Sequence, residues 1–248
     1  MAQAILKQVK AVLFDLFDTL LLIRKNSGDF NEKCVRNVYV FLNKRGINVS
    51  YEDFRRAYSE ARRQIYEKIG GKLEEPHFSV RISLTLLKLG YNYEPSSCLA
   101  RGAAEAYMEE FSHYVYLDDD AIPVLCELRT NGYKTGIISN FAIPEGAHKL
   151  ITSYRLKDLL DTIIISGEAN RRKPSPEIFN LALKELGIKA SEAIFVGDTP
   201  DIDIRGAKNA GMKTILIKRD EAKIDSGEDI PDFTIRSLKE ILRILNKT

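Results

Sequence analysis

The feature that most constrains this chain is the alternation of short apolar segments with helical patterns. Five apolar segments lie at residues 10–14, 133–139, 162–166, 193–196 and 213–217. Helical patterns lie between them at residues 120–130, 176–186 and 202–210. Short segments that are apolar throughout are typical of strands buried on both faces, and their alternation with helices is typical of a parallel sheet. The sequence therefore predicts an α/β fold, to which the tail adds a strand at 232–235 and a helix at 237–245.

The stretch 21–117 has a different pattern, because it contains helical periodicity and no convincing buried strand. One helix is expected to begin after Ser50, which has the character of an N-cap, with Asp53 as the acid three residues on. Other helices are expected near residues 31–45, 79–89 and 95–111. We therefore expect two domains, a sheet core made of residues 1–20 and 118–248 and an inserted all-helical domain at residues 21–117.

Charge and apolar patterning exclude several classes of protein. Lys and Arg number 37 and Asp and Glu 35, so the net charge of +2 gives no basic footprint for nucleic acid. The longest apolar run, residues 11–23, contains two aspartates and is shorter than the roughly 18 residues of a membrane span. Residues 1–10 lack a secretory pattern, so we expect a cytoplasmic protein with no membrane or nucleic-acid partner. Three widely spaced cysteines fit neither a disulfide framework nor a zinc site, and we expect reduced, buried thiols. Nothing indicates the oligomeric state.

Polar residues follow the apolar segments at the points where the predicted strands end. Such positions matter because ligands of an open parallel sheet bind beyond the carboxyl ends of its strands. The candidates are Asp15 and Thr19 after the first strand, Ser139 and Asn140 at the second, Lys173 after the third, and Asp198 and Asp203 after the fourth. Carboxylates, a hydroxyl and an ammonium group at successive strand ends indicate an enzyme site.

These residue types suit the transfer of an anionic group to a carboxylate. Asp15 can attack an electrophile and form an acyl intermediate. Lys173 and a divalent metal can offset the repulsion between that carboxylate and an anionic small-molecule substrate. Asp15 and Asp198 suit Mg²⁺, which prefers oxygen ligands and commonly takes one or two carboxylates. Hydrogen bonds to the transferring group can come from Ser139, Asn140 and Thr19.

Four segments together resemble the motifs of the haloacid dehalogenase-like hydrolase superfamily. They are FDLFDTL at 14–20, IISN at 137–140, RRKPSPEIF at 171–179 and VGDTPDID at 196–203. The resemblance implies a Rossmann-like core with a helical cap of type 1 inserted after the first motif. It also implies a role for each matching residue: Asp15 as nucleophile, Ser139 and Lys173 as ligands of the transferring group, Asp198 and the backbone carbonyl of Phe17 as magnesium ligands, and Asp203 as support of the metal site.

The chain departs from the phosphatases of this superfamily at Phe17, where they carry a second aspartate that serves as general acid and base. Haloacid dehalogenases have an aromatic residue there, but they act without metal and typically carry Ser and Asn around the position of Asp198. The fourth motif therefore favours a magnesium-dependent phosphatase that acts on a small phosphorylated metabolite through an aspartyl phosphate on Asp15. A metal-free 2-haloacid dehalogenase is the first alternative. A phosphorylatable regulatory or binding protein is the second, although the long helical insertion favours an enzyme.

Overall fold

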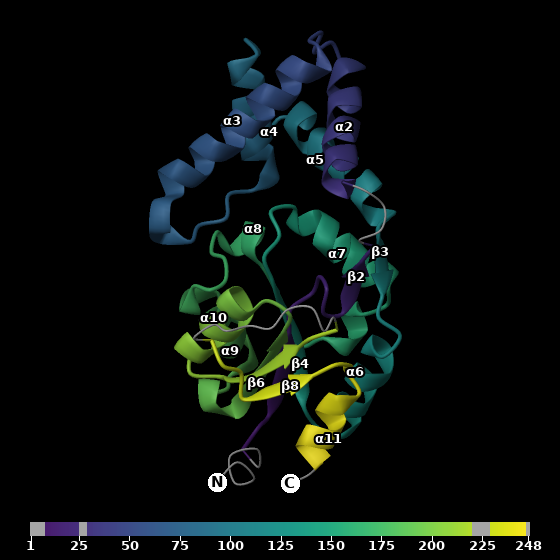
Figure 1. Cartoon of the computed structure of the whole chain (residues 1–248), viewed down its shortest axis with the longest axis vertical. Coiled ribbons are helices and arrows are strands. Elements are labelled where there is room, and N and C mark those ends of the chain that lie inside the picture. The colour runs from purple at the N-terminus through teal and green to yellow at the C-terminus, as the bar shows by residue number, and fades with distance from the viewer. Residues whose placement is uncertain (1–7, 25–28, 220–228, 247–248) are drawn as a thin grey trace.

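A six-stranded parallel sheet forms the centre of the chain, as the computed structural model shows for residues 8–24, 29–219 and 229–246 (Figure 1). The strands lie in the order β5-β4-β1-β6-β7-β8. Their bounds are β1 Ala11–Phe14, β4 Lys134–Ser139, β5 Thr162–Ile165, β6 Ala193–Gly197, β7 Lys213–Ile217 and β8 Phe233–Ile235. The predicted α/β fold is therefore confirmed. β1 lies between β4 and β6 in the middle of the sheet, and all four of its residues are buried.

Helices cover both faces of this sheet. The side chains of β1 alternate between the two faces and pack in a different apolar cluster on each. Val12 and Phe14 pack on one face, in a cluster that includes buried residues of α6 (Ala121–Thr130), α7 (Pro144–Ser153) and α11 (Glu240–Asn246). Ala11 and Leu13 pack on the other face, with α9 (Pro176–Leu186) and α10 (Arg205–Asn209). A short helix, α8 (Ser166–Ala169), follows β5. This alternation explains why the predicted strands are apolar throughout.

Four helices of the predicted insertion form a separate layer beyond the carboxyl ends of the strands (Figure 1). They are α2 Phe30–Asn43, α3 Tyr51–Ile69, α4 Phe78–Lys88 and α5 Cys98–Ser112. The N-cap predicted at Ser50 is present, since its side chain accepts a hydrogen bond from the Asp53 amide. Buried residues of these helices, such as Val38, Phe54 and Ile82, belong to the same apolar cluster as Val12 and Phe14. The apolar cluster on one face of the sheet therefore continues into the inserted helices.

The expectation of no strand in residues 21–117 is wrong at the two ends of that stretch. β2 (Leu21–Ile23) and β3 (Val115–Leu117) pair antiparallel and form a two-stranded ribbon where the chain leaves and re-enters the core. Each strand has three residues, which is too few for a periodic pattern, and each becomes a strand only through its distant partner. The domain boundaries themselves stay a prediction.

Smaller differences concern the thiols and the segment after β6. Cys34 is buried, but Cys98 and Cys126 are exposed, so the expectation of buried thiols is wrong for two of the three. The helix predicted at 202–210 begins as a π-helical turn, Pro200–Ile204, and continues as α10. Such turns are frequent at functional sites. No described helix has the length and apolar character needed to cross a bilayer.

Candidate active site

The candidate residues converge at the carboxyl ends of the three central strands. Asp15 follows β1 directly, and Lys173 reaches it from the loop before α9. The Lys173 Nζ atom lies 2.7 Å from Asp15 Oδ1 and 2.6 Å from Asp203 Oδ1. The Thr19 hydroxyl donates to Asp15 Oδ2 at 3.3 Å. All four side chains are buried, so the predicted nucleophile lies in a dry network of charge-assisted hydrogen bonds.

Two residues at the end of β4 have different roles in this network. Asn140 exchanges two hydrogen bonds with the backbone of Lys173, from Asn140 Nδ2 to the carbonyl at 3.0 Å and from the Lys173 amide to Oδ1 at 2.8 Å. In this structure Asn140 therefore positions Lys173, and its contact with a transferring group stays a prediction. The Ser139 Oγ atom is buried and has no hydrogen-bond partner among the described residues. A buried hydroxyl without a partner is costly, and a bound anion would satisfy it.

Asp203 and Asp198 differ in how far their oxygens are already engaged. Asp203 Oδ2 accepts hydrogen bonds from the amides of Asp198 at 3.1 Å and Thr199 at 3.0 Å, while its Oδ1 pairs with Lys173. Gly197 makes this approach possible, because a Cβ there would lie 2.5 Å from the Asp203 side chain. Asp198 is only partly buried and accepts one weak hydrogen bond, from Thr199 Oγ1 at 3.3 Å. Asp198 can thus still bind a ligand, whereas Asp203 supports the site.

The site carries more negative than positive charge. Oxygens of Asp15, Asp198 and Asp203 all lie within 4.8 Å of one another, and Lys173 is the cation in contact with two of them. Burial, with Asp203 and Asp198 nearby, raises the pKa of Asp15 to about 7 although Lys173 lowers it. Burial and Asp203 raise the pKa of Asp198 to about 6. Burial lowers the pKa of Lys173, but Asp15 and Asp203 outweigh it, so that pKa is raised. A cation would relieve this repulsion.

The Phe17 side chain carries no acid–base group and packs in an aromatic cluster formed by Phe17, Phe111 and Phe141. The Phe17 ring centroid lies 5.4 Å from that of Phe111 on α5 and 4.8 Å from that of Phe141. The next residue, Asp18, has a left-handed backbone with φ 58°, and its carboxylate accepts a hydrogen bond from the Ile23 amide. The local turn uses the Leu16 carbonyl and the Asp18 amide, which leaves the Phe17 carbonyl available.

The sequence analysis missed two contributors to this site. Phe111 lies in the inserted helices, and its apolar character gave no signal that it would reach Phe17. Arg219 follows β7 and donates to the carbonyls of Asp18 and Thr19. Its place in the polar segment after a buried strand was the signal that could have found it.

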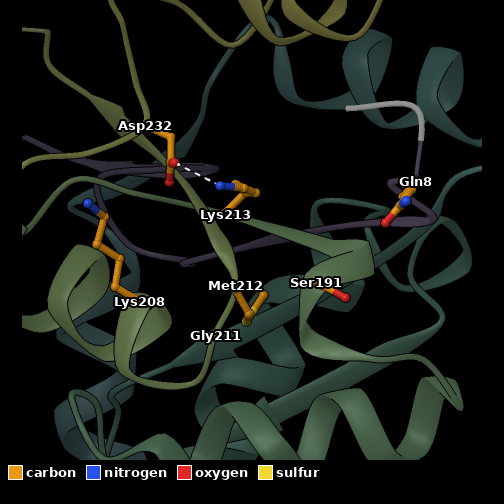
Figure 2. A pocket seen from close by; sticks show the side chains of 7 residues that line it. All are labelled: Gln8, Ser191, Lys208, Gly211, Met212, Lys213 and Asp232. Atoms are coloured by element: carbon orange, nitrogen blue, oxygen red, sulfur yellow. Dashed lines mark hydrogen bonds and ion pairs between the residues drawn. The ribbon is translucent and has the colours of Figure 1, made fainter. Parts of the chain in front are cut away.

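A second pocket, of about 690 Å³, lies at the opposite, amino ends of the strands (Figure 2). Lys213 and Asp232 line it and form an ion pair of 3.3 Å, which the figure marks. Asp232 also accepts hydrogen bonds from the amide and hydroxyl of Thr214, and Lys208 donates to the Ile230 carbonyl. Because these charged groups are already paired, this pocket lacks the unsatisfied groups found around Asp15.

Comparison with known proteins identifies the family. The family model of haloacid dehalogenase-like hydrolases matches residues 9–211, a span that contains Asp15, Ser139, Lys173 and Asp198. The chain belongs to this family. It is therefore a hydrolase, and the resemblance inferred from the four motifs is confirmed.

Two relatives and one solved structure resemble this hydrolase over nearly its whole length. It is 32% identical over 242 residues to a glyceraldehyde 3-phosphate phosphatase of Methanopyrus kandleri, covering 96% of this chain and 98% of that protein. It is 31% identical over 244 residues to a Pyrococcus furiosus protein of the same name, covering 98% and 95%. A 2-haloacid dehalogenase from Pseudomonas syringae shares the fold, with a TM-score of 0.73 at 22% identity and coverage of 96% and 99%.

The buried ion pairs of this hydrolase predict a pH-dependent stability. Lys173→Met should lower the free energy of unfolding by about 3–5 kcal/mol near neutral pH without added metal, because it leaves buried carboxylates without their cation. The pKa of Asp15 is already raised from 3.8 to about 7, and the variant should raise it further. The folded variant then binds more protons than the unfolded chain, so its stability should fall as pH rises through this window.

Urea unfolding of both proteins at acidic and at mildly alkaline pH measures this loss. Lys134→Met is the matched control, because Lys134 is an exposed lysine whose ammonium group donates to the Leu186 carbonyl. A loss of equal size at both pH values would contradict the proposed role of Lys173.

Proposed function

We propose that this hydrolase is a magnesium-dependent phosphatase for small phosphorylated metabolites, with Asp15 as its nucleophile. The observation that carries the proposal is the cluster of three carboxylates, two of them paired with the buried Lys173 ammonium group, together with the unpartnered Ser139 hydroxyl. The two relatives named as glyceraldehyde 3-phosphate phosphatases, which match nearly the whole chain, support it. An anionic small molecule is thus the expected substrate.

The residues present suit phosphoryl transfer in two steps. An Asp15 oxygen attacks phosphorus, the bond from phosphorus to the ester oxygen breaks, and the alcohol leaves with a proton from solvent. Water then attacks the phosphorus of the aspartyl phosphate, and the bond from phosphorus to the Asp15 oxygen breaks. This restores the carboxylate and releases inorganic phosphate, while a proton of the attacking water passes to solvent. Lys173 and Ser139 bind oxygens of the transferring group, while Thr19 and Asn140 orient Asp15 and Lys173. Phe17 cannot donate the proton that the leaving alcohol needs, which sets this site apart.

The donor set of the site fits Mg²⁺. Asp15, Asp198 and the Phe17 carbonyl supply the hard oxygen ligands that this ion prefers. The Asp203 carboxylate accepts hydrogen bonds from the amides of Asp198 and Thr199, so Asp203 acts as support of the metal site. One ammonium group facing three carboxylates leaves two negative charges, which a divalent cation would balance. When bound, the metal would neutralise charge between the nucleophile and an anionic substrate.

The insertion at 21–117 acts in this proposal as a cap over the core made of 1–20 and 118–248. Its helix α5 contributes Phe111 to the aromatic cluster beside Asp15, which excludes water from one side of the nucleophile. A second contact joins α4 to the core, since the Phe78 amide donates to the Ala142 carbonyl at 2.8 Å. The cytoplasm stays the predicted location, and nucleic acid and membrane are not expected partners.

The first test is turnover of an aryl phosphate with added Mg²⁺. The wild type should release phosphate, and Asp15→Asn should abolish turnover because it removes the nucleophile but keeps the shape. Asp18→Asn is the matched control, three residues further along the same loop, and should retain most activity. Near wild-type turnover by Asp15→Asn would contradict the assignment. A single burst of phosphoprotein without turnover would instead indicate the regulatory alternative.

One observation favours a second candidate function, because the aromatic residue at position 17 is also typical of haloacid dehalogenases. Halide departs without a proton, so a dehalogenase needs no acid at this position. Release of halide from a 2-haloacid in the presence of a chelator would establish that function. The phosphatase proposal expects no halide release and complete loss of phosphate release under the same chelation.

Magnesium should stabilise the protein in a pH-dependent way. Protons compete with a metal for carboxylates, and the pKa values of Asp15 and Asp198 are raised to about 7 and about 6. The increase in Tm on adding Mg²⁺ should therefore be larger at about pH 8 than at about pH 5. Asp198→Asn should lose this increase. Asp201→Asn, which changes an exposed aspartate of the same turn, should keep it. An equal shift in both variants would exclude Asp198 as a ligand.

The lack of an acid at position 17 predicts a preference for good leaving groups. For a series of phosphate esters, kcat/KM should fall steeply as the pKa of the leaving alcohol rises. Phe17→Asp should raise turnover of an alkyl phosphate by up to roughly 10²-fold, the low end for a positioned general acid. It should also cost about 0.5–1.5 kcal/mol of stability for each lost ring contact.

Phe17→Asn separates these two effects, because it loses the same ring contacts without gaining an acid. It should be destabilised like Phe17→Asp and show no gain on alkyl phosphates. A flat dependence of the wild-type kcat/KM on leaving-group pKa would mean that another group already supplies the proton.

A further inference from the structure

Arg219, two residues after the end of β7, connects its own segment with two others that are far away in the sequence. Its Nη1 donates to the Asp18 carbonyl at 2.6 Å, and its Nη2 donates to the Thr19 carbonyl at 2.8 Å. The same Nη2 lies 2.7 Å from Asp118 Oδ2. The Asp118 side chain is 14% exposed and that of Arg219 26%, so this charge pair is largely shielded from water. A planar guanidinium has five N–H donors in a fixed fork, so it can serve these three acceptors at once.

The two carbonyls belong to the loop that positions the nucleophile. Within residues 15–23, the Asp18 amide donates to the Leu21 carbonyl at 2.6 Å, and the Leu21 amide donates to the Leu16 carbonyl at 2.8 Å. Asp18 has φ 58°, in the left-handed region that is uncommon for residues with a side chain although Asp adopts it more readily than most. Arg219 donates to the Asp18 and Thr19 carbonyls of this loop, and so helps to maintain the turn.

The third acceptor lies where the chain returns from the insertion. The Asp118 amide donates to the Leu20 carbonyl at 3.0 Å, next to the β2–β3 ribbon. The outgoing and returning chains are therefore bonded to each other, and Arg219 fastens both of them to the end of β7. The two crossings and the nucleophile loop share a single cationic anchor.

We propose that Arg219 is a positioning residue that acts on Asp15 through Thr19. The Thr19 carbonyl is held by Arg219, and the Thr19 hydroxyl donates to Asp15 Oδ2. Because Thr19 is fully buried, a shift of its backbone moves the hydroxyl with it. The same shift would move the loop that carries the Phe17 ring and carbonyl. This inference rests on the proposed phosphatase function for its kinetic readout only.

The test removes the guanidinium and then returns it from solution. Arg219→Ala should lower kcat for an aryl phosphate by at least about tenfold, toward the roughly 10²-fold that a displacement of about 1 Å can cost. KM should stay within about threefold, because Arg219 touches no substrate. Millimolar guanidinium, far below denaturing concentrations, should restore part of kcat by occupying the vacated site. Equimolar sodium chloride should restore none.

Arg129→Ala is the matched control, since Arg129 also pairs with a carboxylate, Asp161 at 3.0 Å, but lies away from the site. It should keep wild-type kcat and show no response to guanidinium. Equal loss of kcat in both variants, or absence of rescue in Arg219→Ala, would overturn the proposal.

Hydrogen exchange gives a readout that does not depend on activity. The amides of Asp18, Leu21 and Ile23 donate within the loop and should exchange faster in Arg219→Ala, returning toward wild-type rates with guanidinium. Unchanged exchange would overturn the positioning role. If the wild type hydrolyses no phosphate ester while these amides respond as expected, the proposed function fails and the positioning role stands.

Discussion

The active centre depends on one buried ammonium group. Lys173 is 1% exposed and lies between Asp15 and Asp203, which approach it from the ends of two neighbouring strands. Removing such charges from water is expensive, and the cost is offset only when each ion has close, well-directed partners. Here two carboxylates are the close partners of the ammonium group, and Asn140 holds the Lys173 backbone in place. Without this lysine the carboxyl ends of β1 and β6 would present mutually repelling charges to each other.

The carboxylates around Lys173 differ because their remaining partners differ. Both carboxylate oxygens of Asp203 are engaged within the protein. One forms an ion pair with Lys173, and the other accepts hydrogen bonds from two amides. Asp15 receives one ammonium and one hydroxyl group, which leaves lone pairs for an electrophile or a metal. Asp198 faces outward with a single weak hydrogen bond. In the proposed function the same chemical group thus serves as support, nucleophile or ligand according to how many donors the fold directs at it.

The inserted helices and the sheet are one packed body at the site. The apolar cluster on one face of the sheet continues into α2, α4 and α5, and Phe111 of α5 meets Phe17 two residues after the nucleophile. Apolar rings at this position supply no proton to a leaving group. An enzyme built in this way should rely on its substrate's leaving group more than one with a carboxylate there.

The sequence by itself predicted the six strands of the parallel sheet and their order along the chain, and it singled out Asp15, Ser139, Lys173 and Asp198 as candidate site residues. These features are local, because a buried strand needs a run of apolar residues and a catalytic group needs its own side chain. The ribbon β2–β3 escaped prediction, since neither of its strands is long enough to have a pattern of its own.

Only the tertiary structure decided which contacts each of these residues makes. Lys173 meets Asp15 across 158 residues of sequence, and Arg219 meets the Asp18 carbonyl across 201. Asn140 holds a backbone segment 33 residues away, and Phe111 reaches Phe17 from another layer. Such contacts depend on where the strands lie in the sheet and how the helices pack. Neither can be predicted from the residues that surround one position in the sequence.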